Sequence, residues 1–250
     1  MANRTVTTLH GRQDIPDLKP LYLGFSDMPL VSISDAQRQP VPKANFVATG
    51  AAWNSHRPVR ADIPPARRLR RLPRAHLAGK RPDRAIRIAR TLGIPLKIAA
   101  KVDRADEAYF REQIEPMLQA PGVEFIGEIN EREKRSFSAR LARCLFPVDW
   151  PEPFGIVMIE AMACGTPVLA FRCGSVPEIV ENGVTGQIVD TEEEAIRQLP
   201  EVLALDRRAV RRRFEQRFSA HPHGEGLSSS LSHAHETAFA CCPMSILKST

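Results

Sequence analysis

The stretch Pro151–Phe171 reads PEPFGIVMIEAMACGTPVLAF and combines a turn, an apolar run of small residues and a short buried strand. Its apolar run predicts a helix over Pro153–Cys164, and PVLAF predicts the strand that follows. Two carboxylates mark this helix, with Glu152 just before its start and Glu160 in its second turn. An acidic pair beside a Pro/Gly turn makes this stretch the first candidate for a functional site.

Helical and strand patterns alternate on both sides of this stretch, from Lys80 to Ser219. Pro116 should kink or end one predicted helix, and Thr191 with Glu194 forms a capping box at the start of another. The predicted helices are RPDRAIRIARTLG, DEAYFREQIEPMLQA, NEREKRSFSARLA, VPEIVE, TEEEAIRQLPEVLA and DRRAVRRRFEQRF, and the other predicted strands are IPLKIAAKV, VEFIGEI, RCLFPVD and TGQIVD. Such alternation predicts the α/β class, with a Rossmann-like, doubly wound parallel sheet.

The remaining sequence divides at changes of composition. Residues 1–49 contain three short apolar runs with little helix between them, so they predict an incomplete N-terminal α/β fragment. Residues 50–79 form a basic Arg/Pro-rich linker, and 80–219 form the main domain. The Ser- and His-rich tail, 220–250, should be disordered.

The basic segment 50–79 carries the whole net charge of +6, because it has seven arginines, no lysine and one acid. Prolines interrupt any helical or strand period in it. Three interpretations stay open: a basic arm for nucleic acid or acidic lipid, a disordered linker, or a stretch translated out of frame. The segment lacks the aromatic residues that alternate with basic ones in single-strand binders, which disfavours nucleic acid as a partner.

Composition excludes several classes of protein. A chain of 250 residues with 43% hydrophobic and 26% charged residues is typical of a globular protein with a proper core. No run approaches the roughly 18 apolar residues of a membrane span, and the start lacks the apolar core of a secretory signal. The five cysteines show no C-x-x-C pair or metal spacing. We therefore expect free thiols, a cytoplasmic protein and no transmembrane segment.

The chemistry of the central stretch points to a phosphorylated ligand. In an open parallel sheet, ligands bind at the carboxyl ends of the strands, where helix N-termini direct free amides. The amides of Phe154, Gly155 and Ile156 should therefore face an anion such as a diphosphate. Glu152 and Glu160 lie about 12 Å apart along the helix axis, so they suit separate hydroxyl-bearing groups of one long ligand. The spacing alone proves little; the whole string is the specific signal.

PEPFGIVMIEAMACGTPVLA, followed by GSVPEIVENGVTGQIV, resembles the donor-binding half of the retaining glycosyltransferases of family 4, the group 1 glycosyl transferases, which have the GT-B fold. The resemblance extends from about Lys80 to Phe218. It implies that Glu152 lies by the donor sugar, that Glu160 holds the nucleotide ribose, and that the turn after Pro153 provides the amides that meet the sugar and the diphosphate.

The same resemblance implicates two residues outside the central stretch. Lys80 matches a lysine that neutralises the leaving diphosphate, and His10 in TVTTLHG matches a histidine beside the reacting sugar. The family's arginine in G-R-x4-K falls on Ala75, with Arg74 out of register, and the repeated units that precede TVTTLHG in the family are absent from this sequence. We interpret the chain as a truncated, partly degenerate member.

Three hypotheses about function follow. The first is a glycosyltransferase that moves a sugar from a UDP-, GDP- or ADP-sugar to a sugar, lipid or small-molecule acceptor, with retention of configuration, no cofactor and no obligatory metal. The second is a nucleotide-sugar-binding remnant without turnover. The third is a nucleic-acid-binding protein that acts through residues 57–74, whose affinity would fall steeply with salt.

Overall fold

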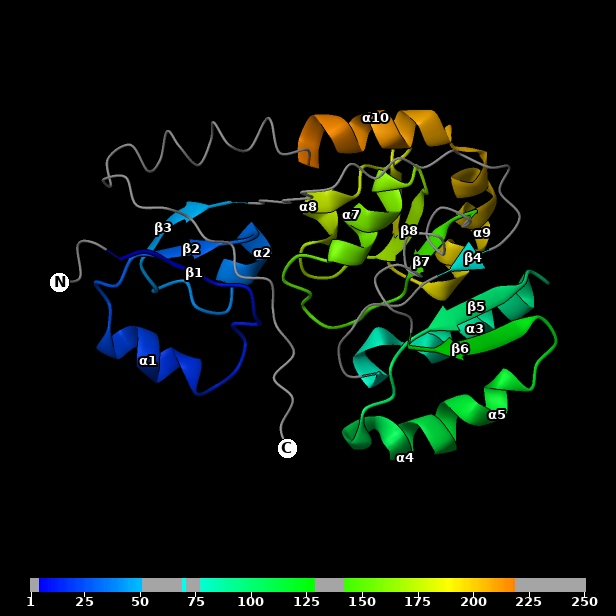
Figure 1. The fold of residues 1–250 in the computed structure, drawn as a ribbon, viewed down its shortest axis with the longest axis horizontal. Helices are drawn as coiled ribbons and strands as arrows, with labels where there is room; N and C mark the ends of the chain where they lie inside the picture. The colour runs from blue at the N-terminus through cyan, green and yellow to red at the C-terminus, as the bar shows by residue number, and fades with distance from the viewer. Residues whose placement is uncertain (1–4, 51–68, 71–76, 129–141, 219–250) are drawn as a thin grey trace.

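The computed structural model describes residues 5–50, 69–70, 77–128 and 142–218. The described residues form a small N-terminal fragment and a larger C-terminal unit that lie side by side (Figure 1). Every described strand pairs in parallel with its neighbours, and the class is α/β as predicted. The predicted helix NEREKRSFSARLA and the tail lie outside the described residues, as does most of the basic segment.

The N-terminal fragment contains a three-stranded sheet with β2 in the centre. All three residues of β2 are buried, which fits a parallel strand with neighbours on both sides. Tyr22, Leu30 and Val41 form its buried core. Its elements are β1 (Thr7–Thr8), α1 (Leu18–Gly24), β2 (Leu30–Ser32), α2 (Asp35–Arg38) and β3 (Phe46–Thr49).

The C-terminal unit has two three-stranded sheets, β4-β5-β6 and β7-β8-β9, and β4 lies against β7. The strands therefore follow the spatial order β6-β5-β4-β7-β8-β9, which is the doubly wound order with its reversal between β4 and β7. Their bounds are β4 (Leu69–Arg70), β5 (Leu96–Ala99), β6 (Val123–Gly127), β7 (Cys144–Phe146), β8 (Val168–Phe171) and β9 (Gly186–Val189).

Strand β4 lies within the segment that we expected to contain no strand. Leu69 pairs with Leu96 and Arg70 with Lys97, so the expectation is wrong at these two residues. The reason is non-local. The backbone N–H and C=O groups of β5 need hydrogen-bonding partners, and the backbone of any residue except proline can both donate and accept.

The helices of the C-terminal unit cover the faces of its sheet (Figure 1). The capping box of α9 is present, because the Thr191 hydroxyl accepts a hydrogen bond from the Glu194 amide at 3.2 Å. In a standard capping box the Glu194 carboxylate would accept from the Thr191 amide. Here it accepts from the Asp190 amide, one residue earlier. The main helices are α3 (Pro82–Thr91), α7 (Ile156–Ala163), α8 (Val176–Ile179), α9 (Glu192–Ala204) and α10 (Arg207–Phe218).

The predicted interruption near Pro116 is confirmed. A 3-10 turn and α4 are followed by a π-helical turn and then by α5, which contains the proline. Proline has no N–H to donate to the preceding turn, so the hydrogen-bonding pattern changes there. The bounds are Arg104–Asp106, Glu107–Tyr109 for α4, Phe110–Ile114 for the π-helical turn and Glu115–Leu118 for α5.

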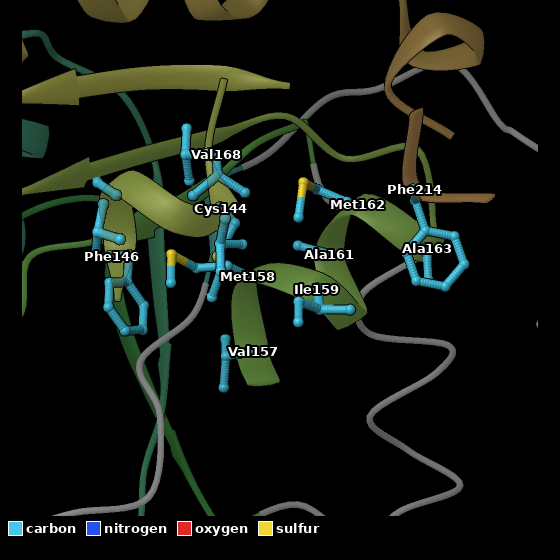
Figure 2. Packing of buried hydrophobic residues seen from close by; sticks show 14 of the residues in the cluster. Cys144, Phe146, Val157, Met158, Ile159, Ala161, Met162, Ala163, Val168 and Phe214 are labelled. Carbon is cyan, nitrogen blue, oxygen red and sulfur yellow. The ribbon is translucent and has the colours of Figure 1, made fainter. Parts of the chain in front are cut away.

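Helix α7 is buried on nearly all sides, and Figure 2 shows its side chains packed among those of β7, β8 and α10. Its alanines allow close approach of these neighbours. The helix begins at Ile156 and not at Pro153 as predicted, because Gly155 has a left-handed backbone with φ +68°. Labelled residues of this cluster are Cys144, Phe146, Val157, Met158, Ile159, Ala161, Met162, Ala163, Val168 and Phe214.

Two glycines with left-handed backbones provide a test of this packing. A Cβ on Gly165 would lie 2.6 Å from the carbonyl oxygen of Arg207, whereas a Cβ on Gly93 would meet nothing within 4 Å. Gly93→Ala should lower the free energy of unfolding by about 1–2 kcal/mol through backbone strain alone. Gly165→Ala should cost at least about 1 kcal/mol more because α7 and α10 must separate. Urea denaturation would measure both, and equal losses would contradict this account of the contact.

Candidate functional site

The candidate site lies where the strand order reverses, at the carboxyl ends of β4 and β7, which is where open α/β sheets bind ligands. A 3-10 turn, Ala78–Lys80, precedes α3, and a loop over 147–155 follows β7. The two segments pack together: the Asp149 amide donates to the Gly79 carbonyl at 3.2 Å. A Cβ on Gly79 would lie 3.1 Å from the ring of Trp150, so a larger residue there would require the ring to shift by a few tenths of an ångström.

Glu152 is the central carboxylate of the site. Its Oε1 accepts a hydrogen bond from the Gly155 amide at 3.3 Å. Burial raises the pKa of Glu152 above its ordinary value, and this effect outweighs the opposing effects of the Gly155 and Phe154 amides and of the positive charges of Lys80 and Arg12. The site therefore makes the charged form of Glu152 less favourable than it is in water.

Lys80 lies at the end of the 3-10 turn with only 1% of its surface exposed, and its charge acts on Glu152. The next residue, Arg81, has a left-handed backbone with φ +51°, which is unusual for a residue with a side chain. Its guanidinium pairs with Asp83 at 3.0 Å and with Asp149 at 2.6 Å. These pairs tie the start of α3 to the loop after β7, and so fix Lys80 beside that loop.

The residues predicted to bind an anion differ from one another in their surroundings. The amide of Gly155 faces the Glu152 carboxylate, so the expectation that it points freely at a ligand is not met here. Phe154 is buried, whereas Ile156 is half exposed at the N-terminus of α7. Glu160 lies half-buried in the second turn of this helix.

The N-terminal fragment brings a cation to the site that the sequence had not singled out. His10 is exposed just after β1. Two residues later, the Arg12 guanidinium lies 4.9 Å from the centroid of the Trp150 ring and lowers the pKa of Glu152 by its charge. Arg12 also pairs with Asp14 at 2.5 Å. Its position after a strand, close to the predicted His10, was the signal that could have identified it.

The loop between β8 and α8 supports Glu152 from behind. The Ser175 amide donates to the Glu152 carbonyl at 3.0 Å, and the Cys173 thiol donates to the Trp150 carbonyl at 3.0 Å. Gly174 has φ +50°, and a Cβ there would lie 2.4 Å from the carbonyl oxygen of Glu152. In the sequence, GSVPEIVENGVTG is recognisable only as part of a family pattern, which does not indicate that its first residues contact the backbone of Glu152.

Within the described ranges, no three His, Cys, Asp or Glu residues are grouped as metal ligands. None of the described cysteines, Cys144, Cys164 and Cys173, forms a disulfide. None of the helices in this part of the chain has the length and apolar character that crossing a membrane requires.

The model of the family "Glycosyl transferases group 1" matches residues 75–218. This is more than half of the chain, and the chain therefore belongs to this family. The match includes Lys80, Glu152, α7 and α8, so it covers the C-terminal part of the site described above.

Curated relatives match over shorter stretches. A probable sucrose-phosphate synthase of Thermosipho melanesiensis is 40% identical over 89 residues, which are 34% of this chain and 21% of that protein. A D-inositol 3-phosphate glycosyltransferase of Mycobacterium sp. strain KMS is 54% identical over 41 residues, 16% of this chain and 9% of that protein. The chain thus matches about a fifth or less of the length of these relatives.

Solved structures show the same GT-B-like fold over nearly the whole chain. HepE of Anabaena, crystallised with UDP-glucose, has a TM-score of 0.71 at 18% identity, covering 91% of this chain and 72% of that one. Sucrose-phosphate synthase of Thermosynechococcus elongatus has a TM-score of 0.69 at 17% identity, covering 92% and 67%. The predicted family and fold are therefore confirmed.

The raised pKa of Glu152 predicts how stability responds to its removal. A carboxyl group whose pKa rises on folding costs stability at neutral pH, and this cost disappears below its ordinary pKa. Glu152→Gln should therefore raise the unfolding temperature at pH 7, and the gain should fade as the pH falls through the raised pKa and then the ordinary one. Thermal unfolding across a pH series would measure this.

Glu192 is a matched control, because hydrogen bonds from Arg87 lower its pKa. The stability from a lowered carboxyl pKa is present above the ordinary value and lost as the pH falls through the lowered one. Glu192→Gln should therefore destabilise the protein at pH 7, with the difference disappearing in acid. A loss of stability at pH 7 in both variants would contradict the account of Glu152.

Proposed function

We propose that this chain binds a nucleoside-diphosphate sugar and transfers the sugar to an acceptor with retention of configuration. The observation that carries the proposal is the meeting of buried Lys80, Glu152 and the N-terminus of α7 at the reversal point of the sheet. A buried cation and a helix N-terminus both stabilise negative charge, as a diphosphate requires. Membership of the glycosyl transferases group 1 and the likeness to HepE with UDP-glucose support this donor class.

The proposed roles follow the charge that develops during transfer. As the acceptor hydroxyl oxygen bonds to the anomeric carbon, the bond to the diphosphate oxygen breaks. The nucleoside diphosphate leaves with the electron pair and takes up the proton of the acceptor hydroxyl. Lys80 and the Ile156 amide at the start of α7 stabilise that growing negative charge. A fixed cation and a helix dipole can perform this work without an obligatory metal.

Glu152 and Glu160 bind the two ends of the donor in this proposal. Glu152 accepts hydrogen bonds from the sugar hydroxyls, and Glu160 accepts them from the ribose of a UDP-, GDP- or ADP-sugar. Phe154, Gly155 and Ile156 line the turn between them. His10 approaches the reacting sugar from the N-terminal fragment, and the acceptor is a sugar, a lipid or a small molecule.

Two substitutions test separately how the chain binds the ribose end and the sugar end of the donor. Glu160→Ala should weaken the binding of UDP and of UDP-glucose alike, by about 10-fold or more, because both ligands contain the ribose. Glu152→Ala should weaken UDP-glucose by a similar factor and leave UDP within about 2-fold, because only UDP-glucose contains the sugar. Isothermal titration calorimetry would measure both affinities, with the exposed Glu201→Ala on α9 as the control.

Binding and transfer are separate outcomes of this experiment. Saturable binding together with the release of UDP in the presence of an acceptor would support a transferase. Binding without UDP release would favour the nucleotide-sugar-binding hypothesis instead. An absence of saturable binding to UDP-, GDP- and ADP-glucose would rule out the proposed function.

A further inference from the structure

We infer that Ser34 of the N-terminal fragment positions the Pro153–Gly155 turn, through a hydrogen-bonded bridge that Glu178 completes. The inference rests on the proposed function in one respect: the turn is taken to contact the donor sugar. The bridge itself consists of contacts between segments that are more than 100 residues apart in the sequence.

The Ser34 hydroxyl uses both of its hydrogen-bonding capacities. Its Oγ donates to the Pro153 carbonyl at 2.5 Å and accepts from the Gln37 amide at 3.0 Å. Ser34 is the N-cap of α2 and is only 2% exposed, so water cannot readily replace either partner. The orientation of the hydroxyl therefore fixes the Pro153 carbonyl, which lies directly between Glu152 and Phe154.

Glu178 forms the second half of the bridge, from the C-terminal unit to α2. Its Oε2 accepts from the Asp35 amide at 2.9 Å, and its Oε1 accepts from the Ala36 amide at 2.8 Å. These amides belong to the first turn of α2, where the helix cannot satisfy its own N–H groups. A carboxylate that accepts from two such amides makes strong, charge-assisted hydrogen bonds, so it fixes the fragment in one orientation.

The segment Gly174–Ile179 joins the two halves. At one end, Gly174 and Ser175 contact the backbone of Glu152, and at the other the Glu178 side chain binds α2. Arg217 of α10 donates to the carbonyls of Glu178 and Ile179 at 2.5 Å and 2.9 Å, which holds this second end in place. The segment therefore transmits the position of α2 to the backbone that carries Glu152.

A cavity of about 320 Å³ adjoins the bridge and is lined by Ser34, Phe154, Ser175 and Glu178, among others. Beside this cavity, Ile33 of the fragment packs against the apolar cluster that contains Phe154, and the hydrogen bonds of the bridge add a directional contact to this packing. Loss of the Ser34 hydroxyl would leave the Pro153 carbonyl without its donor. The turn would then move relative to Glu152, which affects both a bound sugar and the diphosphate that the start of α7 contacts in the proposed function.

The test compares Ser34→Ala and Glu178→Gln with Ser34→Thr, which keeps the hydroxyl and can place its methyl group toward the cavity. Ser32→Ala is the matched control, because Ser32 is buried in β2 and its hydroxyl bonds to Thr49 within the fragment. Hydrogen–deuterium exchange of the amides over 154–157, without ligand, is the first readout. The second is affinity for UDP-glucose and for UDP.

Ser34→Ala and Glu178→Gln should each raise amide exchange over 154–157 by about 10-fold, which corresponds to one lost hydrogen bond. They should weaken UDP-glucose by about the same factor and UDP as well, because both ligands contain the diphosphate, while Ser34→Thr and Ser32→Ala behave as wild type. A merely structural role would instead raise exchange throughout the fragment and spare the turn.

Two results would overturn the inference. One is unchanged exchange over 154–157 in both Ser34→Ala and Glu178→Gln. The other is an equal increase in Ser32→Ala, because the Ser32 hydroxyl bonds to Thr49 and not directly to a member of the bridge. If the wild type binds no nucleotide sugar, the proposed function fails, but the exchange measurements still decide whether Ser34 positions the turn.

Discussion

A carboxylate removed from water needs amides or cations around it, and Glu152 imposes this requirement on every loop of the site. Lys80 contributes a cation from the turn before α3, and Arg12 contributes another from the N-terminal fragment. The Gly155 amide contributes a hydrogen bond. Even so, burial dominates and the pKa of Glu152 stays raised, as is common for residues at functional sites.

Glycine makes this arrangement possible at two points. Gly155 adopts a left-handed backbone, which ends the loop and starts α7. Gly174 lies so close to Glu152 that a Cβ would overlap both its carbonyl oxygen and its amide nitrogen. Any other residue at position 174 would push the β8–α8 loop away and release the backbone of Glu152. The site thus depends on the absence of side chains as much as on their presence.

The sequence predicted the features that depend on local pattern. Alternating helix and strand patterns were sufficient for the α/β class, and Pro116 and Thr191 marked the interruption and the cap correctly, because these effects act within one turn of chain. The run from Pro151 to Phe171 gave α7 and β8, but not the start of α7. That start depends on the backbone of Gly155, and glycine is compatible with several conformations.

The sequence could not predict features that depend on contacts between distant residues. Strand β4 forms because β5 offers it a ladder, although its own Arg/Pro-rich surroundings argue against a strand. Arg12 and Ser34 acquire their roles only when the fragment docks, since their partners Trp150 and Pro153 lie more than 100 residues away. No periodicity or spacing contains that information. These polar groups meet only in the folded chain.

The fragment and the C-terminal unit therefore both contribute residues to the candidate site. The C-terminal unit carries Lys80, Glu152 and α7, which suffice in principle to bind an anion. The fragment adds a second positive charge near Glu152 through Arg12 and fixes the adjoining turn through Ser34. Binding energy contributes to catalysis only when groups are fixed where charge develops in the transition state. A turn that both the fragment and the C-terminal unit contact meets this condition better than one that only the C-terminal unit contacts. Contact with the fragment thus gives the proposed nucleotide-binding unit the geometry that the proposed transfer requires.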